Sequence, residues 1–264
     1  MQRRRFLASS LAASAAALTG KAEAQATSAR PREYYELRKY LMQSGPQTKL
    51  TENYLSAALI PALNRLGMSP IGVFNVSIGP ETPAIYVLTP STSLETLVAN
   101  RLRLTDDQQF RQAAEPFWSA PAKEPPFVRI ESQLLIAFEG WPKLTPPPSA
   151  AQHGKRMFEL RTYESATVQD HVRKVEMFNK GEFEIFKKAG FDQVFYGDAL
   201  IGTRLPHLTY MLSFADLTDR DAKWEAFRNN PDWKKLSSDP RYAFEPIVSN
   251  ITNLILTPTT FSQI

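Results

Sequence analysis

The sequence predicts an α+β protein in which two tandem ferredoxin-like βαββαβ domains are packed sheet to sheet as a fused dimeric α+β barrel. An internal repeat and the order of strands and helices in each copy support this fold. Residues 35–40, YELRKY, recur as FELRTY at residues 158–163, which is 123 positions later. Residues 66–67 and 189–190, where the first long helices are predicted to end, differ by the same offset. Ordered matches at a constant offset indicate that one domain was duplicated.

Residues 1–24 are predicted to be a twin-arginine signal peptide. Three arginines at residues 3–5 precede a run of small and apolar residues, and a small-residue cleavage site ends at Ala24. The run is too short and too weakly apolar to span a bilayer. We therefore expect cleavage after Ala24 and a periplasmic or secreted mature protein.

Removal of this segment changes the charge of the protein. The 264 residues include 31 Lys and Arg against 27 Asp and Glu, and residues 1–24 contain four of the former and one of the latter. The 27 positive and 26 negative residues that remain nearly cancel, so no nucleic-acid partner is expected. The mature chain contains no stretch of 18 apolar residues, so no membrane span is predicted.

Several classes of chemistry are disfavoured by missing residues and motifs. The absence of cysteine excludes disulfides and thiolate metal sites. The sequence also lacks the glycine-rich nucleotide-binding motifs, the Gly-x-Ser-x-Gly of serine hydrolases and the His-Glu-x-x-His of zinc proteases. No cofactor and no metal are therefore predicted, and a small-molecule ligand and a homo-oligomer are the partners that remain.

The predicted domain boundary is a proline-rich segment. Residues 140–155 include the run GWPKLTPPPS, whose prolines favour an extended linker. Residues 25–139 then form the first ferredoxin-like domain, and residues 156–264 form the second.

The second copy reads as strand, helix, two strands, helix and strand. Residues 157–163 alternate apolar and polar residues, which is typical of a strand. The next helix begins after a cap at Thr167 and ends at Gly190. Its predicted buried stripe consists of Val168, Val172, Val175, Phe178, Ile185, Phe186 and Ala189.

The first copy follows the same order. Its first helix ends at Gly67, and Pro61 within it predicts a kink or a break. Residues 106–118 are predicted to add a helical segment. The remaining strands of the two copies are predicted at 71–78, 84–88, 128–138, 193–201, 208–214 and 247–256.

Polar side chains on the two opening strands are the main candidates for a binding site. Period-two alternation places them together on one face of each strand. If the apolar face packs on the helices, the polar set points into the barrel, where charges must pair or bind a ligand. The alternative to a binding site is that the Glu and Arg residues form ion pairs that hold the two sheets together. The candidate ligand-binding residues are Glu36, Arg38, Tyr40, Glu159, Arg161, Tyr163 and Trp233.

Two residues are candidates for acid–base catalysis. His171 lies near the start of a helix and Tyr163 lies beside Arg161 on the strand. No acidic residue lies at a helical spacing that would let it act together with His171. The alternative is that His171 is a helix residue without a catalytic role. Trp233 and Trp224 are candidates for a pocket wall, with a place in the core as the alternative.

The chain resembles the NIPSNAP family of the dimeric α+β barrel superfamily. The motif Glu159-Leu160-Arg161-x-Tyr163, the helix end at Gly190 and the run Asn230-Pro231-Asp232-Trp233 carry the resemblance. The first copy has Glu115-Pro116-Phe117-Trp118 in place of the Pro-Asp-Trp element, so the resemblance implies one degenerate and one typical domain. It implies a fold and a barrel cavity, and it supplies no catalytic residues.

The sequence therefore predicts an exported protein that binds a small, mostly apolar ligand in the barrel or between helices and sheet. Two alternatives remain. One is a cofactor-independent oxygenase or isomerase acting on a small aromatic or similar molecule. The other is a structural or interaction module, which a barrel filled by side chains would favour.

Overall fold

The computed structural model describes residues 31–152 and 154–264. The predicted signal peptide, residues 1–24, lies outside these ranges. Within them, no helix combines the length and the apolar character needed to cross a membrane. Residues 31–264 form one compact unit.

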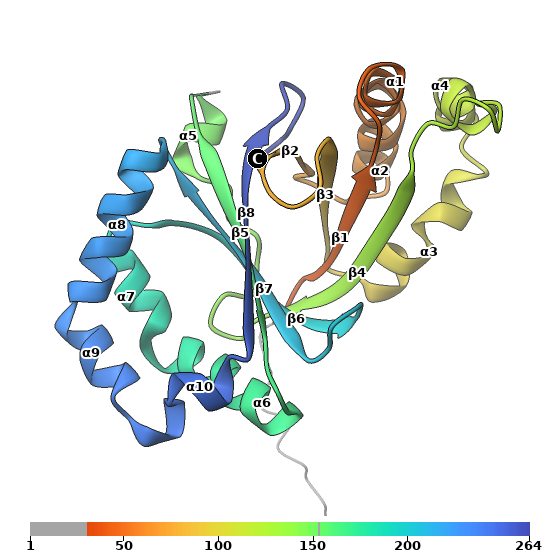
Figure 1. Ribbon diagram of the computed structural model, residues 1–264. Coiled ribbons are helices and arrows are strands. Elements are labelled where there is room, and N and C mark those ends of the chain that lie inside the picture. The colour runs from red at the N-terminus through yellow and green to blue at the C-terminus, as the bar shows by residue number, and fades with distance from the viewer. Residues whose placement is uncertain (1–30, 153) are drawn as a thin grey trace, which may run out of the picture. The chain divides into compact units, whose positions relative to one another are not determined.

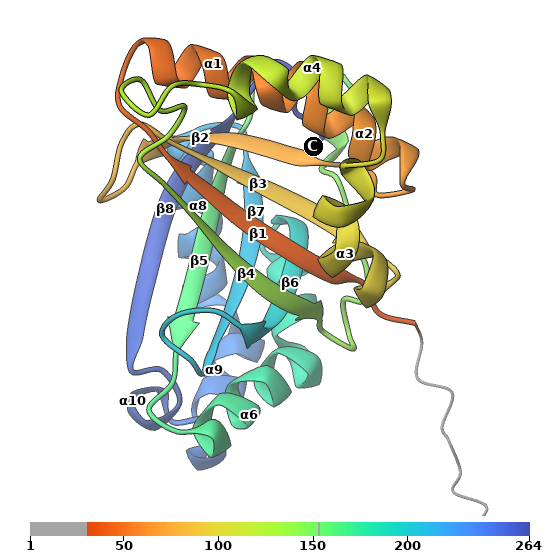
Figure 2. The ribbon, with the colours of Figure 1, turned by 90° about the vertical axis from the view of Figure 1, so that its right-hand side faces the viewer.

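Eight antiparallel strands of the described residues close into one barrel (Figures 1 and 2). The first half contributes the order β4-β1-β3-β2 and the second contributes β8-β5-β7-β6, which is the ferredoxin-like order twice. The halves join edge to edge at β2–β8 and at β4–β6. The strands are β1 (Tyr34–Leu41), β2 (Gly72–Ile78), β3 (Ala84–Ser91), β4 (Arg129–Ala137), β5 (Met157–Glu164), β6 (Asp192–Ile201), β7 (His207–Phe214) and β8 (Asn250–Pro258). The predicted fold class is confirmed.

The helices of each half cover the outer face of that half's own strands (Figure 1). In the first half they are α1 (Pro46–Tyr54), α2 (Ile60–Arg65), α3 (Leu94–Leu104) and α4 (Gln108–Trp118), the last of which matches the predicted additional segment. In the second half they are α6 (Val168–Met177), α7 (Phe183–Lys188), α8 (Leu217–Asn229), α9 (Pro231–Ser237), a short 3-10 turn η3 (Pro240–Tyr242) and α10 (Phe244–Ile247). The short α5 (Pro148–Ala151) lies in the predicted linker.

A π-helical turn interrupts the first long helix of each half. Turn η1 (Leu55–Leu59) joins α1 to α2, and η2 (Phe178–Glu182) joins α6 to α7. The two turns are 123 residues apart, so the interruption is part of the repeat. The break expected near Pro61 is present, but the second half has the same turn without a proline at that place. Proline is therefore not its only cause.

Apolar side chains from both halves fill the barrel, which corrects the predicted orientation of the opening strands. The interior cluster includes Tyr35, Leu37, Phe74, Leu88, Leu135, Phe158, Leu160, Phe195, Met211, Leu254 and Leu256, all of them buried. The polar set on β1 and β5 therefore faces the helices. Among the described residues, the two largest pockets discussed below lie between helices and sheet, which is the other place predicted for the ligand.

The buried face of α6 also differs from the predicted stripe. Val168 is 68% exposed and Val172 is 57% exposed, whereas His171 and Lys174 are buried together with Met177. The helix therefore turns two ionisable side chains toward the sheet. Because a buried charge must be paired, we expect groups of opposite charge or hydrogen-bond partners for them on the strands and the neighbouring helices.

Both long helices end in the same hydrogen-bonded cap. In the second half the N–H of Phe191 donates to the carbonyl of Phe186 and that of Gly190 donates to Lys187, while Gly190 has a φ of 81°. This is the Schellman arrangement, in which glycine avoids the strain of a left-handed backbone. We expect Gly190→Ala to lower the free energy of unfolding by about 1 kcal/mol in urea titrations. Gly202→Ala, where φ lies outside the left-handed region, serves as the control, and an equal loss in it would contradict the explanation.

Candidate functional site

The main candidate site is a pocket of about 750 Å³ between the sheet of the second half and its helices. Its floor comes from β5, and its walls come from α6, η2, α8, α9 and the segment around α10. The floor and lower walls carry ionisable groups, namely Arg161, Tyr163, Lys174, Glu182 and Arg220. The other walls include the aromatic and aliphatic side chains of Met177, Trp224, Phe227, Trp233, Tyr242, Phe244 and Ile247. Residues of α8 and α9 complete the lining, namely Thr218, Asp221, Ala222, Glu225, Arg228 and Ser237.

A fully buried carboxylate organises the floor. Glu159 accepts hydrogen bonds from Arg161 Nη1 at 2.9 Å and Arg220 Nη2 at 2.6 Å, both on Oε1. Its other oxygen accepts from the indole N–H of Trp224 at 2.8 Å. The side chain of Glu159 is 0% exposed, so these three donors take the place of the hydrogen bonds that water would make to the carboxylate.

Arg161 connects this carboxylate to the phenol of Tyr163. Its Nη2 donates to the Tyr163 hydroxyl at 2.9 Å, and Tyr210 donates to the same oxygen at 2.9 Å. The guanidinium carbon lies 4.5 Å from the ring centroid of Trp224, which is a cation–π geometry. Burial opposes the charge of Arg161, but Tyr210, Tyr163 and Glu159 outweigh it and raise the pKa of the guanidinium. Arg161 is therefore a fixed cation.

A buried ion pair lies on the opposite wall. Lys174 Nζ donates to Glu182 Oε2 at 2.8 Å, and both side chains are 3% exposed. Burial raises the pKa of Glu182, and Lys174 only partly offsets this effect. Glu182 lies in the π-helical turn η2, a local structure that is frequent at functional sites.

Sequence reasoning missed this ion pair as well as Arg220. Only the burial of Lys174 had a sequence signal, because His171, Lys174 and Phe178 lie three and four residues apart on one face of the helix. The exposed valines of the same helix made another face look like the buried one.

The first half contains a second, larger pocket of about 1240 Å³ at the equivalent place. It contains the predicted residues Glu36, Arg38 and Tyr40. Arg38 Nη2 donates to Glu36 at 2.6 Å and Arg38 Nη1 donates to Tyr40 at 3.4 Å. The 123-residue offset puts Thr51 and Leu59 where the second half has Lys174 and Glu182. The motif is therefore shared, but the ion pair is not.

The remaining predicted residues divide between the pocket and the scaffold. Trp233 lines the second-half pocket, with its ring 4.5 Å from that of Phe227. His171 is buried, and its Nε2 lies 2.6 Å from Asp198 Oδ1 on β6. This is a partner that sequence spacing did not reveal. Among the described residues, however, His171 lines none of the pockets discussed here, so its contact joins helix α6 to the sheet.

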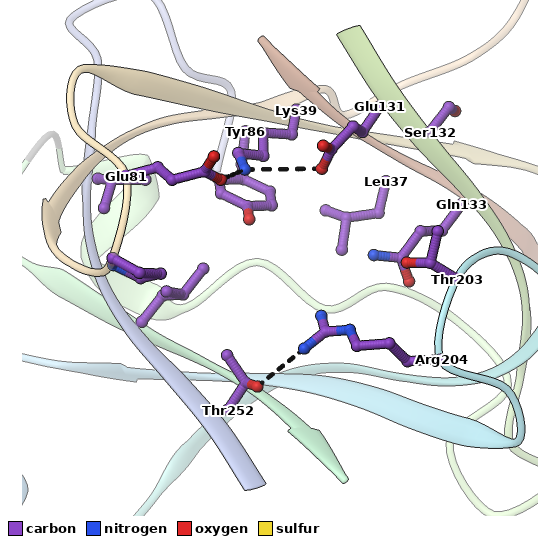
Figure 3. Close-up of a pocket in the computed structure, with 13 residues that line it drawn as sticks. Leu37, Lys39, Glu81, Tyr86, Glu131, Ser132, Gln133, Thr203, Arg204 and Thr252 are labelled. Carbon is purple, nitrogen blue, oxygen red and sulfur yellow. Dashed lines mark hydrogen bonds and ion pairs between the residues drawn. The ribbon is translucent and has the colours of Figure 1, made fainter. Parts of the chain in front are cut away.

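A third pocket, of about 270 Å³, lies at one mouth of the barrel between the two halves (Figure 3). Lys39 forms ion pairs with Glu81 and Glu131 on one side, and Arg204 donates to Thr252 at 3.1 Å on the opposite side. Burial raises the pKa of the Tyr86 hydroxyl to about 12. The charges in this pocket all have partners, since Arg204 pairs with Glu164 outside the lining at 3.2 Å. The pocket is also much smaller than the helix–sheet pockets.

Solved structures with the same fold include two proteins named "putative monooxygenase". The one from Lactobacillus acidophilus has a TM-score of 0.55 at 10% identity, covering 86% of this chain and 94% of that chain. The one from Fusobacterium nucleatum has a TM-score of 0.53 at 10% identity, covering 87% and 93%. At this identity the likeness concerns the fold alone.

Solved structures that cover less than half of this chain are also found. An uncharacterized NIPSNAP-like domain protein from Burkholderia xenovorans is 22% identical, with a TM-score of 0.37, and covers 42% of this chain and 90% of that chain. No curated protein matches the chain. The NIPSNAP family model, however, matches twice, at residues 35–137 and 158–263, which together make up most of the sequence. The chain therefore belongs to the NIPSNAP family.

Proposed function

We propose that this NIPSNAP protein binds a small, mostly apolar molecule in the second-half pocket, between the sheet and helices α6, α8, α9 and α10. The observation that carries the proposal is a cavity of about 750 Å³ whose walls include the aromatic rings of Trp224, Phe227 and Trp233 and whose floor holds a few convergent polar groups. Small-molecule sites have this size and this combination of surfaces. The first-half pocket has apolar walls too, but lacks the buried Lys174–Glu182 pair.

Trp233 is the residue whose removal tests this proposal most directly. It lies on the wall formed by α9, and Lys174 Nζ is 5.9 Å from its ring centroid. With the neutral fluorescent probe N-phenyl-1-naphthylamine, we expect one saturable site in the wild type. Trp233→Ala is expected to weaken it about tenfold, because an aromatic wall is removed from the ligand.

Trp118→Ala discriminates between the two halves. Trp118 lines the first-half pocket and is 49% exposed. If that variant loses the probe while Trp233→Ala keeps it, the binding site is in the first half and the proposal is wrong. Urea titration of both variants will verify that each is folded.

A cofactor-independent oxygenase or isomerase is the second candidate function. The Tyr163 hydroxyl, held by Arg161 and Tyr210 at the pocket floor, is the observation that favours it. Two structures of the same fold are named for monooxygenase activity. Oxygen consumption or product formation with a panel of small aromatic substrates tests this candidate. An Arg161→Ala variant with full turnover would remove Arg161 from the mechanism.

A further inference from the structure

The charges at the floor of the second-half pocket do not balance. One carboxylate oxygen of Glu159 serves two guanidiniums, Arg161 and Arg220. The other partner of Arg220 is Asp221, whose side chain is 72% exposed and is therefore largely compensated by water. Lys174 and Glu182 compensate each other. The partly buried floor consequently carries an excess of one positive charge at Arg220, whose side chain is 24% exposed.

The same groups keep hydrogen-bond donors that the described residues do not use. Arg220 Nε is buried and has no acceptor among them. The Tyr163 hydroxyl accepts from Arg161 and Tyr210, and its own proton has no acceptor there. Lys174 has three protons, of which one goes to Glu182 and one makes a long contact of 3.5 Å to Met177 Sδ. Unused donors around a cationic floor are a site for an anion.

We infer that the ligand of this pocket is an organic monocarboxylate with an apolar or aromatic body, bound with its carboxylate at Arg161, Arg220 and Tyr163. This inference rests on the proposed function and specifies its ligand class. The aromatic walls above the floor take the apolar body, so the acid enters head first. A single carboxylate matches the excess of one positive charge, whereas a phosphate dianion would leave an uncompensated negative charge beside Glu159.

The first half supports the assignment by contrast. There Glu36 and Arg38 pair one to one, and Ser132 donates to the same Glu36 oxygen at 2.6 Å. The further arginine on that pocket's lining, Arg101, is exposed to solvent. The floor of the first-half pocket has no buried excess of charge, so it is not expected to select an acid.

A comparison of 2-naphthoate with its neutral amide, 2-naphthamide, tests the inference by isothermal titration calorimetry at pH 7. We expect the acid to bind at least about tenfold more tightly than the amide, because charge-assisted hydrogen bonds form only with the acid. Raising the salt concentration should weaken the acid more than the amide. 2-Naphthyl phosphate is expected to bind more weakly than the acid.

Arg220→Gln is the sharpest variant, because it removes the excess charge while Glu159 keeps Arg161 and Trp224 as partners. We expect it to weaken the acid about tenfold and to leave the amide within about twofold. Arg161→Gln, which changes the arginine on strand β5, is a second variant for the same comparison of acid and amide. The matched control is Arg173→Gln, which removes an arginine paired with Asp170 outside the pocket lining and should leave both ligands unchanged.

The outcomes separate the two proposals. Equal binding of acid and amide, unaltered by Arg220→Gln, would overturn the monocarboxylate inference while leaving an apolar site in place. Failure of acid, amide and N-phenyl-1-naphthylamine alike would overturn the proposed function together with the inference.

Discussion

Glu159→Ala is expected to lower the free energy of unfolding by about 3–5 kcal/mol, because it leaves two guanidiniums and an indole N–H without their shared acceptor. Glu159 is fully buried at the centre of these contacts, so water cannot replace it. Urea unfolding followed by circular dichroism at pH 7 will measure the change.

Glu36→Ala, the equivalent change in the first half, provides the control. The Glu36 side chain is 17% exposed and pairs with one guanidinium, Arg38, which is 15% exposed. Solvent reaches both groups, so we expect a loss of about 1–2 kcal/mol. If the two variants lose the same stability, the argument from burial and from the two-to-one pairing is wrong.

Lys174→Met is expected to cost about 3–5 kcal/mol at pH 8, because it leaves the carboxylate of Glu182 buried without a counter-ion. The loss should be smaller at pH 5. Burial raises the pKa of Glu182 in the folded protein, so over this range the folded state binds more protons than the unfolded state. Stability therefore falls as the pH rises, and loss of the lysine strengthens this fall.

The double variant Lys174→Met/Glu182→Leu isolates the role of the carboxylate. It places at residue 182 the leucine that the first half has at Leu59. We expect it to be at least as stable as Lys174→Met at pH 5 and clearly more stable at pH 8, since no buried charge remains. Thermal unfolding of both variants and the wild type at the two pH values will decide. A double variant with the same pH dependence as Lys174→Met would exclude Glu182 as the titrating group.

The sequence was sufficient to predict the barrel, but not which side of each strand faces inward. Alternation fixes which residues share a face, so Glu159, Arg161 and Tyr163 were grouped correctly. Both faces of this strand are buried, one by the other sheet and one by the helices, and both include aromatic residues. Periodicity alone cannot distinguish two buried faces, and the helix-facing one accepts charges because partners from neighbouring helices reach it.

The ion pair of the site was hidden for a different reason. Lys174 and Glu182 are eight residues apart and meet across a π-helical turn, which shifts the register of the helix. A regular period of 3.6 residues therefore does not indicate that these two side chains meet. Arg220 reaches Glu159 from 61 residues away, so that contact depends on tertiary structure.

The covalent connection of the two halves has a consequence for how their pockets evolve. In a homodimer every substitution appears in both copies, so a residue that improves one pocket must be tolerated in the other. Here Thr51 and Lys174 occupy matching positions within one polypeptide and differ. A substitution in one pocket of the fused chain therefore leaves the other pocket unchanged, and selection can act on each separately.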